Sequence, residues 1–281
     1  MPVKNLKSAY VRVSVETQEQ LAAAVEIPGI DLIYLDAGLF SPESWREAAA
    51  RIHKGSGGFG KLAVLRLPQI WRSRTERFFS EKGQAWNTSG FDAYLAGNTE
   101  EILWLKENGI PAEQILSDHS VYSFNEESED ALRELTGIGT LSQTYSTELN
   151  EKELKALAAR LKRKDPDIRR ELIVYGRVPL MISAQCLRKT SIGCDRRCSL
   201  LWMKDRTGAL MPVKNRCPFC ISTIYNSVPT VLFDLEDDIR AIGPDFIRYE
   251  FTTESGKQVR DILSGNVPGQ FTRGHFKRGV L

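Results

Sequence analysis

The residues of this chain best suited to chemistry are its five cysteines, which all lie between Cys186 and Cys220 of a 281-residue sequence. A thiolate is a soft ligand, and four of them in tetrahedral reach hold a zinc ion or an iron–sulfur cluster. The spacing alone slightly favours zinc, because the Cys-x2-Cys pair formed by Cys217 and Cys220 is its usual knuckle. Five cysteines are one more than such a site needs, so we expect one to lie outside the ligand set.

The same Cys-x2-Cys pair also has the form of a dithiol redox motif, in which one thiolate attacks and the other resolves. That chemistry needs a thioredoxin-like strand and helix around the motif. The many strand and helix patterns that precede the pair, and three further cysteines beside it, favour a metal site instead.

The cysteine segment is a basic patch within a chain of formal net charge +2. Positive side chains there would balance the negative charge of a thiolate-bound metal. They would equally bind RNA by releasing phosphate counterions, with Trp202, Phe219 and Tyr225 stacking on unpaired bases. Both interpretations remain open for the basic residues of this segment, which are Arg188, Lys189, Arg196, Arg197, Lys204, Arg206, Lys214 and Arg216.

Short apolar runs alternate with helical patterns along the rest of the chain. Helices are predicted at 17–26, 42–53, 100–108, 127–135, 151–162, 235–242 and 257–264. Strands are predicted at 10–15, 32–35, 62–67, 92–96, 114–118, 140–145, 172–175 and 246–251. Eight strands alternating with helices favour an α/β fold of the closed (β/α)8 TIM-like barrel type over an open doubly wound sheet.

Two segments interrupt this alternation. Residues 68–89 contain no clear pattern and are interpreted as a long irregular loop and a candidate lid. The cysteine-rich segment follows the seventh strand. We therefore expect a barrel built from 1–184 and 223–281, with a metal-binding insertion at 185–222 over its mouth.

In a barrel, function lies where the strands end, so the polar residues at those ends are candidates for the site. Beyond Glu16, Asp36, Asn98 and Glu250, we predict catalytic roles for four residues, which are Asp118, His119, Tyr145 and Glu148. We predict contacts to a phosphate-bearing substrate for Arg66, Arg177, Arg188, Lys189 and Arg206.

A Ser-His-Asp triad is not expected from Asp118, His119 and Ser120, because neighbours on a strand point to opposite faces. His119 is instead interpreted as a packed or substrate-facing residue. Glu148 is a general base or polar anchor, or else it caps the next helix together with Thr147. His275 lies in a basic tail and is expected to be exposed, with contact to a ligand as the alternative.

Several stretches of the sequence resemble the collagenase-like peptidase U-32 family. The signature region of that family is similar to ELIVYGRVPLMISAQC, from Glu171 to Cys186. Residues 117–125 and 141–150 resemble the family's fifth and sixth strand ends, and 217–227 resembles the segment that closes its cysteine region. The ending FTRGHFKRGV, residues 271–280, is similar to the tail motif of longer members.

This resemblance carries several implications. The family name implies proteolysis, yet several members act in hydroxylating RNA bases or a quinone precursor and hold a four-iron cluster on similar cysteines. Carried onto this chain, the ligands would be Cys186, Cys194, Cys217 and Cys220, with Cys198 in reserve. Longer relatives have a further domain, so the rest of a longer polypeptide or a family paralogue is an expected partner.

The predicted function is therefore that of an iron–sulfur-dependent protein acting in hydroxylation of RNA bases or a related aromatic substrate. The alternatives are a collagenase-like peptidase, which is a hydrolase, and a non-catalytic metal-stabilised binding module. The expected cofactor is a 4Fe–4S cluster, with zinc replacing it in protein purified in air. No run of the roughly eighteen apolar residues that a membrane span needs is present, and a cytoplasmic protein without a membrane partner is expected.

Overall fold

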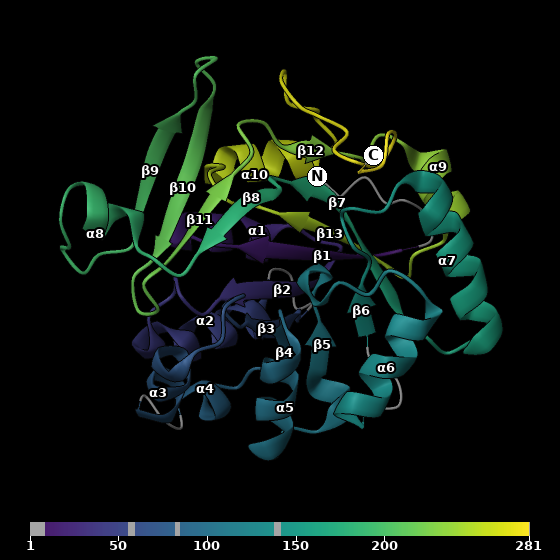
Figure 1. Cartoon of the computed structure of the whole chain (residues 1–281), viewed down its shortest axis with the longest axis horizontal. Helices are drawn as coiled ribbons and strands as arrows, with labels where there is room; N and C mark the ends of the chain where they lie inside the picture. The colour runs from purple at the N-terminus through teal and green to yellow at the C-terminus, as the bar shows by residue number, and fades with distance from the viewer. Residues whose placement is uncertain (1–8, 56–59, 82–84, 138–141, 281) are drawn as a thin grey trace.

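The computed structural model describes residues 9–55, 60–81, 85–137 and 142–280, and its centre is a closed barrel of eight parallel strands. The neighbouring strands follow the order β7-β13-β1-β2-β3-β4-β5-β6, and β6 pairs with β7 to close the ring (Figure 1). The predicted (β/α)8 TIM-like fold is thus confirmed. The strands are β1 (Tyr10–Val15), β2 (Ile30–Asp36), β3 (Leu62–Arg66), β4 (Ala93–Ala96), β5 (Ile115–Ser117), β6 (Ser142–Thr144), β7 (Arg170–Gly176) and β13 (Phe246–Glu250).

Helices cover the outside of the barrel at the predicted places. A representative case is α7, where Asn150 and Glu153 form a capping box and Leu154, Leu157 and Leu161 face the core. Among the described helices, none has both the length and the apolar character needed to cross a membrane. The helices between the barrel strands are α1 (Gln18–Glu26), α2 (Pro42–Lys54), α5 (Thr99–Glu107), α6 (Glu126–Thr136), α7 (Glu151–Lys164), α9 (Glu236–Ile242) and α10 (Gly256–Leu263).

The strands are buried on both faces, as a parallel sheet requires. On β2, Ile33 and Leu35 belong to the large core shared with the helices, whereas the alternate residues Leu32 and Tyr34 belong to a second cluster. This alternation follows from the two-residue period of a strand. The second cluster consists of Leu32, Tyr34, Val64, Ala93, Leu95 and Leu116.

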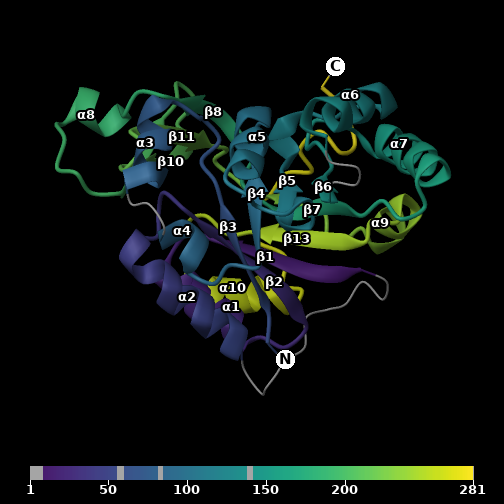
Figure 2. The same cartoon turned by 90° about the horizontal axis from the view of Figure 1, so that it is seen from below.

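The segment 68–89, predicted to be an irregular loop, instead contains the helices α3 (Ser73–Glu81) and α4 (Ala85–Thr88); residues 82–84 lie outside the described part. The buried Phe79 of α3 stacks on Trp71 at 5.5 Å and on Phe219 at 5.9 Å between ring centroids. Helix α3 therefore lies on the side of the molecule that carries the cysteine segment (Figure 2) and supports it.

The insertion after β7 is a second, antiparallel sheet with the strand order β8-β11-β10-β9, which stands at the left of the barrel in Figure 1. It extends beyond the expected range 185–222 at both ends, from Pro179 to Tyr225. Its elements are β8 (Pro179–Ser183), α8 (Leu187–Ser191), β9 (Ser199–Lys204), β10 (Leu210–Arg216) and β11 (Ile221–Tyr225). The chain then returns to the barrel through β12 (Thr230–Val231), which pairs antiparallel with β7.

Buried ion pairs join this small sheet to the ends of the first two barrel strands. Lys214 Nζ lies 2.6 Å from Glu16 Oε2, and Arg216 Nη2 lies 3.0 Å from Glu16 Oε1 and 2.7 Å from Asp36 Oδ2. Charges removed from water in this way are stable only when they are closely paired. Glu16 and Asp36, expected among the functional strand ends, thus hold the small sheet in place.

Candidate functional site

A network of buried charges runs through the barrel interior, from Glu171 near the start of β7 to Asp118 and Glu250 where strands end. Arg248 Nη2 lies 2.5 Å from Asp118 Oδ1 and 3.1 Å from Glu250 Oε1, and its Nη1 lies 2.9 Å from Glu171 Oε1. Arg66 contacts Asp118 at 3.0 Å and Glu250 at 3.2 Å. Burial opposes ionisation of Asp118, but the two facing guanidinium groups outweigh it and hold its pKa well below the usual range. Arg66, predicted to contact substrate phosphate, therefore serves this interior network.

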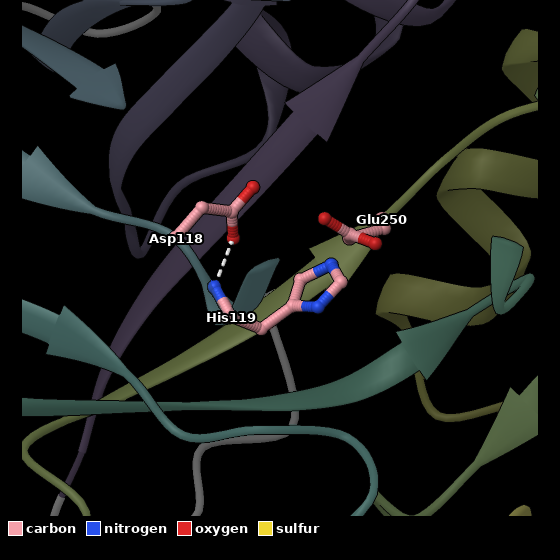
Figure 3. Close-up of side chains that lie close together, drawn as sticks. All are labelled: Asp118, His119 and Glu250. Atoms are coloured by element: carbon pink, nitrogen blue, oxygen red, sulfur yellow. Dashed lines mark hydrogen bonds between the residues drawn. The ribbon is translucent and has the colours of Figure 1, made fainter. Parts of the chain in front are cut away.

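Asp118 and His119 lie closer together than the sequence predicts. Strand β5 ends at Ser117, and Asp118 caps the short 3-10 helix η2 (His119–Val121), where its carboxylate accepts a 2.8 Å hydrogen bond from the His119 N–H. Strand alternation ends at that turn. Figure 3 shows the imidazole turned toward Glu250, and ligand atoms of Asp118, His119 and Glu250 lie within 4.8 Å of one another. The expectation that the Asp118 and His119 side chains diverge was therefore wrong.

Asp118, His119 and Ser120 do not form a nucleophile triad, and Asp118, His119 and Glu250 do not form a favourable cation site. The Ser120 hydroxyl donates a 2.8 Å hydrogen bond to the Gly97 carbonyl. Both carboxylates are already paired with arginines, and a cation between them would be repelled by these guanidinium groups. Burial lowers the pKa of His119, so the imidazole is neutral, and its Nε2 has no hydrogen-bond partner among the described residues. The trio is therefore better suited to hydrogen bonding than to holding a metal.

His119 lies at the boundary of two hollows in the barrel mouth. One is a small cavity of about 40 Å³, which we call the inner cavity and which is also lined by Tyr145, Thr230 and Glu250. The other is an open pocket of about 400 Å³, which we call the β8 pocket because one wall is formed by Val178 to Ile182. The remaining residues that line the β8 pocket are Gln69, Ser120, Tyr122, Thr147, Glu148 and His275.

All four predicted catalytic residues lie at these hollows or beside His119. Tyr145 lines the inner cavity, and burial raises its pKa, so the phenol stays protonated near neutrality. Glu148 lines the β8 pocket. The alternative in which Thr147 and Glu148 cap α7 is wrong, because the Asn150 side chain accepts the hydrogen bonds from the first turn. His275 lies at both hollows and is not fully exposed.

The remaining predicted substrate-binding residues lie apart from one another. Arg177 lines the inner cavity, but its guanidinium donates hydrogen bonds to the Asn226 carbonyl at 3.0 Å and to the Thr253 hydroxyl at 3.2 Å. Arg188 forms a bidentate pair with Asp195 at 2.7 and 2.9 Å. Lys189 lines the hollow that contains the cysteines, and Arg206 is exposed in the turn between β9 and β10. The structure does not bring them into one phosphate site.

Four of the cysteines line one open hollow in the small sheet, which we call the thiol hollow. Cys186 is not among them: it is buried, and its Sγ lies 3.8 Å from Asn215 Oδ1. Cys198, the reserve ligand in the set implied by the resemblance, does line the hollow, and its Sγ lies 3.2 Å from the Gly38 carbonyl oxygen. The residues lining the thiol hollow are Arg74, Lys189, Cys194, Arg196, Cys198, Cys217, Pro218 and Cys220.

The thiols of this hollow influence one another. Burial, followed by the charges of Cys198 and Cys194, raises the pKa of Cys217, and burial also raises the pKa of Cys198. Four thiolates therefore need a bound cation to ionise together. Zn–S bonds of about 2.3 Å hold thiolates about 3.8 Å apart. In the described part of the chain no three cysteine sulfurs lie within 4.8 Å of one another, so the thiols are not arranged as they would be around a single zinc ion.

Strained backbone conformations occur at the β8 pocket and at the thiol hollow. Outside glycine, positive φ angles occur among the described residues at Tyr122 (59°), Arg196 (58°) and Cys220 (54°). Tyr122 lines the β8 pocket, and the other two line the thiol hollow. Residues other than glycine rarely adopt this backbone conformation, and strained residues cluster at binding sites.

Some residues of the site escaped the sequence interpretation. Gln69 and Tyr122 line the β8 pocket, and their only signal is a position shortly after the ends of β3 and β5. Two residues expected to stack on bases are instead structural: Phe219 is buried against α3, and the Tyr225 hydroxyl bonds to Glu16. Trp202, in contrast, is 52% exposed.

The chain was compared with known protein families, curated proteins and solved structures. A scan against models of protein families finds no match, and neither does a search of curated proteins. Among solved structures, the YdjI aldolase from Escherichia coli K12 is 12% identical, with a TM-score of 0.45 over 92% of this chain and 87% of that chain. The Bacillus cereus spore cortex-lytic enzyme SleL is 10% identical, with a TM-score of 0.42 over 95% and 75% of the two chains.

Proposed function

We propose that this chain is an iron–sulfur protein related to the peptidase U-32 family, acting in hydroxylation of RNA bases or another aromatic substrate. The observation that carries the proposal is the thiol hollow, where Cys194, Cys198, Cys217 and Cys220 lie together. When bound, a cluster on these thiolates would supply electron transfer. The resemblance of residues 171–186 to the family signature supports the same class.

The surroundings of the thiol hollow are suited to an anionic cluster. Four thiolates on an oxidised four-iron cluster leave a net charge of about −2. The basic residues Arg74, Lys189 and Arg196 line the same hollow and would balance that charge. Arg74 Nε also donates a 3.0 Å hydrogen bond to the Pro218 carbonyl, between the last two cysteines. These contacts fix the segment that would carry two of the ligands.

The β8 pocket is the proposed substrate site. Neutral His119 would form part of the pocket wall, while Asp118, held by Arg248, fixes the backbone of His119. Glu148 is the carboxylate within the pocket that is available as a proton acceptor. Each of these residues binds, orients or moves a proton in the proposed reaction.

Metal analysis of protein purified without oxygen tests the proposal. We expect iron with a matching amount of acid-labile sulfide and a visible absorption band. Single substitution of Cys194, Cys198, Cys217 or Cys220 by Ser should remove most of both, because each removal leaves three ligands. Cys186→Ser is the matched control and should retain them.

Two results would contradict this proposal. One zinc per chain without sulfide, from strictly anaerobic protein, would make the hollow structural or hydrolytic. Loss of iron in Cys186→Ser but not in Cys198→Ser would restore the ligand set implied by the resemblance. In the first case the peptidase and binding-module alternatives would gain support.

A further inference from the structure

We infer that the surface around the thiol hollow is the docking site for an acidic electron-carrier protein. This inference rests on the proposed function and deepens it by naming the kind of partner. In that function the carrier would give up one electron and the cluster would gain it. We call this surface the cationic face, and its positive residues are Arg74 and Arg77 of α3, Lys189 of α8, and Arg196 and Arg197 of the loop that follows α8.

The first observation is that segments far apart in the sequence bring positive charge to one hollow. Arg74 lines the thiol hollow together with Lys189 and Arg196. The hydrogen bond of 3.0 Å from Arg74 Nε to the Pro218 carbonyl fixes α3 against the cysteine segment. Figure 2 accordingly shows α3 on the same side of the molecule as α8. The fold therefore gathers these cations, although they are more than a hundred positions apart along the chain.

Two further arginines extend the cationic face beyond the hollow. Arg77 is three positions after Arg74 on α3, and residues at that spacing are neighbours on a helix surface. Arg197 lies between Arg196 and Cys198, which both line the hollow. Both arginines are exposed. Arg77 and Arg197 are therefore accessible to a partner without lining the hollow that would hold the cluster.

The second observation is that the cations of this face lack acidic partners within the chain. The ion pair here joins Arg188 to Asp195. Among the described residues, no carboxylate lies within 4.0 Å of the five positive side chains of the cationic face, and Glu76 and Glu81 of α3 are exposed. Five positive charges exceed the charge of about −2 on a thiolate-bound cluster, so the face stays positive when the cluster is bound.

This positive charge is a local feature, because the whole chain has a formal net charge of only +2. A patch of one sign steers a partner of the opposite sign to the surface and orients it there. Electron-transfer complexes are weak and bury less than about 1,200 Å². A small charged face is therefore sufficient for this kind of partner.

The side chains of the face favour a protein over a single-stranded nucleic acid. Unpaired bases are bound by stacking on aromatic rings, and the described residues that line the thiol hollow include none. The exposed Trp202 lines a separate pocket beside α10. Ile192, in the loop that carries Cys194, is 66% exposed. An exposed apolar side chain among arginines resembles the apolar centre and polar rim of a protein interface.

Binding of a plant-type [2Fe–2S] ferredoxin, a small acidic electron carrier, tests the inference. The oxidised ferredoxin carries a fluorescent label, the chain is purified without oxygen, and anisotropy gives the dissociation constant at several salt concentrations. We expect binding at an ionic strength of about 0.01 M that weakens by about tenfold or more at about 0.1 M, because the screening length falls from about 30 Å to about 10 Å.

Two charge reversals locate the site. Arg77→Glu and Arg197→Glu should each weaken binding at low salt by about fivefold, the upper range for an exposed ion pair, and leave iron and sulfide unchanged. Arg160→Glu is the matched control, because it makes the same change of charge at an exposed residue of α7, which lies at the opposite end of the molecule from α8 (Figures 1 and 2). It should bind within about twofold of the unchanged protein, since distant exposed charges are screened.

The inference would be overturned if Arg77→Glu and Arg197→Glu bound ferredoxin like the unchanged protein, or if Arg160→Glu weakened binding as much as they do. A labelled single-stranded RNA decamer is titrated in parallel. RNA that binds more tightly than ferredoxin, and that is weakened by the same two reversals, would assign the face to nucleic acid and would also overturn the inference.

Iron and sulfide, measured on every preparation, separate this inference from the proposed function. Ferredoxin binding that depends on Arg77 and Arg197 in protein without a cluster would retain the acidic docking site and refute the proposed function. A cluster in protein that does not bind ferredoxin would do the reverse.

Discussion

At the scale of single residues, the site depends on side chains that the fold removes from water. Parallel strands and their ends could be predicted from the sequence, and so the position of Asp118, His119, Tyr145 and Glu148 at the barrel mouth could be predicted as well. The positions of Gln69 and Tyr122 at the β8 pocket, and of Cys198 rather than Cys186 at the thiol hollow, could not, because they follow from which loops meet in space. No spacing along the chain encodes that meeting.

The buried neutral imidazole of His119 predicts a dependence of stability on pH. Burial lowers its pKa from the ordinary value of 6.5, so the folded protein takes up this proton less readily than the unfolded chain. Its contribution is fully present above about pH 6.5 and is lost as the pH falls below that value. Glutamine does not titrate. Between about pH 7.5 and pH 5.5, we therefore expect the free energy of unfolding of His119→Gln to fall by up to about 1 kcal/mol less than that of the unchanged protein.

Denaturant unfolding of both proteins at several pH values provides this measurement. The other histidines are present in both proteins, so their effects cancel in the difference. Parallel stability curves for the two proteins would show that His119 can be protonated in the fold.

At the scale of elements, β-branched and apolar runs predicted all eight barrel strands. Two kinds of element were missed. Helix α3 buries only Thr75 and Phe79 in an otherwise polar, arginine-rich stretch, so its period is weak. The strands of the small sheet are short and partly exposed, so their alternation of buried and exposed residues is weak. The cluster of cysteines also favoured the interpretation of this segment as a metal-binding loop.

The β2–α2 connection approaches the small sheet so closely that only glycine fits. A Cβ on Gly38 would lie 2.9 Å from Arg216 Cβ and 3.0 Å from the Phe219 ring. We expect Gly38→Ala to shift the turn between β10 and β11, destabilise the protein by about 1–3 kcal/mol and lower its iron content. Thermal unfolding and metal analysis check both effects.

Gly269→Ala is the matched control, because an added Cβ there meets nothing within 4 Å. Its stability should stay within about 0.5 kcal/mol of the unchanged protein. Equal behaviour of the two variants would mean that the small sheet moves aside without consequence.

At the scale of the whole molecule, the barrel and the small sheet are joined by buried charges. Glu16 lies at the centre of this joint, paired with Lys214 and Arg216 and hydrogen bonded to the Tyr225 hydroxyl. Charge pairing across two sheets cannot be predicted from a sequence, since it depends on where the insertion folds back. The barrel itself was predictable because its pattern is local and repeated.

Glu16→Gln should therefore separate the stability of the two sheets. Removing one partner of a buried ion pair costs about 3–5 kcal/mol. We therefore expect Glu16→Gln to accelerate amide exchange in β10 and β11 and to leave exchange in β4 and β5 as it is in the unchanged protein. Glu26→Gln is the control, because Glu26 is 64% exposed and lies 3.6 Å from Arg260. Uniformly faster exchange throughout the barrel would contradict a joint that is local to the small sheet.

The antiparallel pairing of β12 with β7 has a consequence for how this protein can change. Gly176 at the end of β7 lies opposite Thr230 of β12, so the chain leaves the barrel and returns to it at the same rung of the ladder. The segment between these two residues therefore begins and ends at neighbouring points of the barrel. Lengthening, shortening or exchanging this segment leaves the register of the eight barrel strands unchanged, and so the inserted sheet can vary while the barrel stays constant.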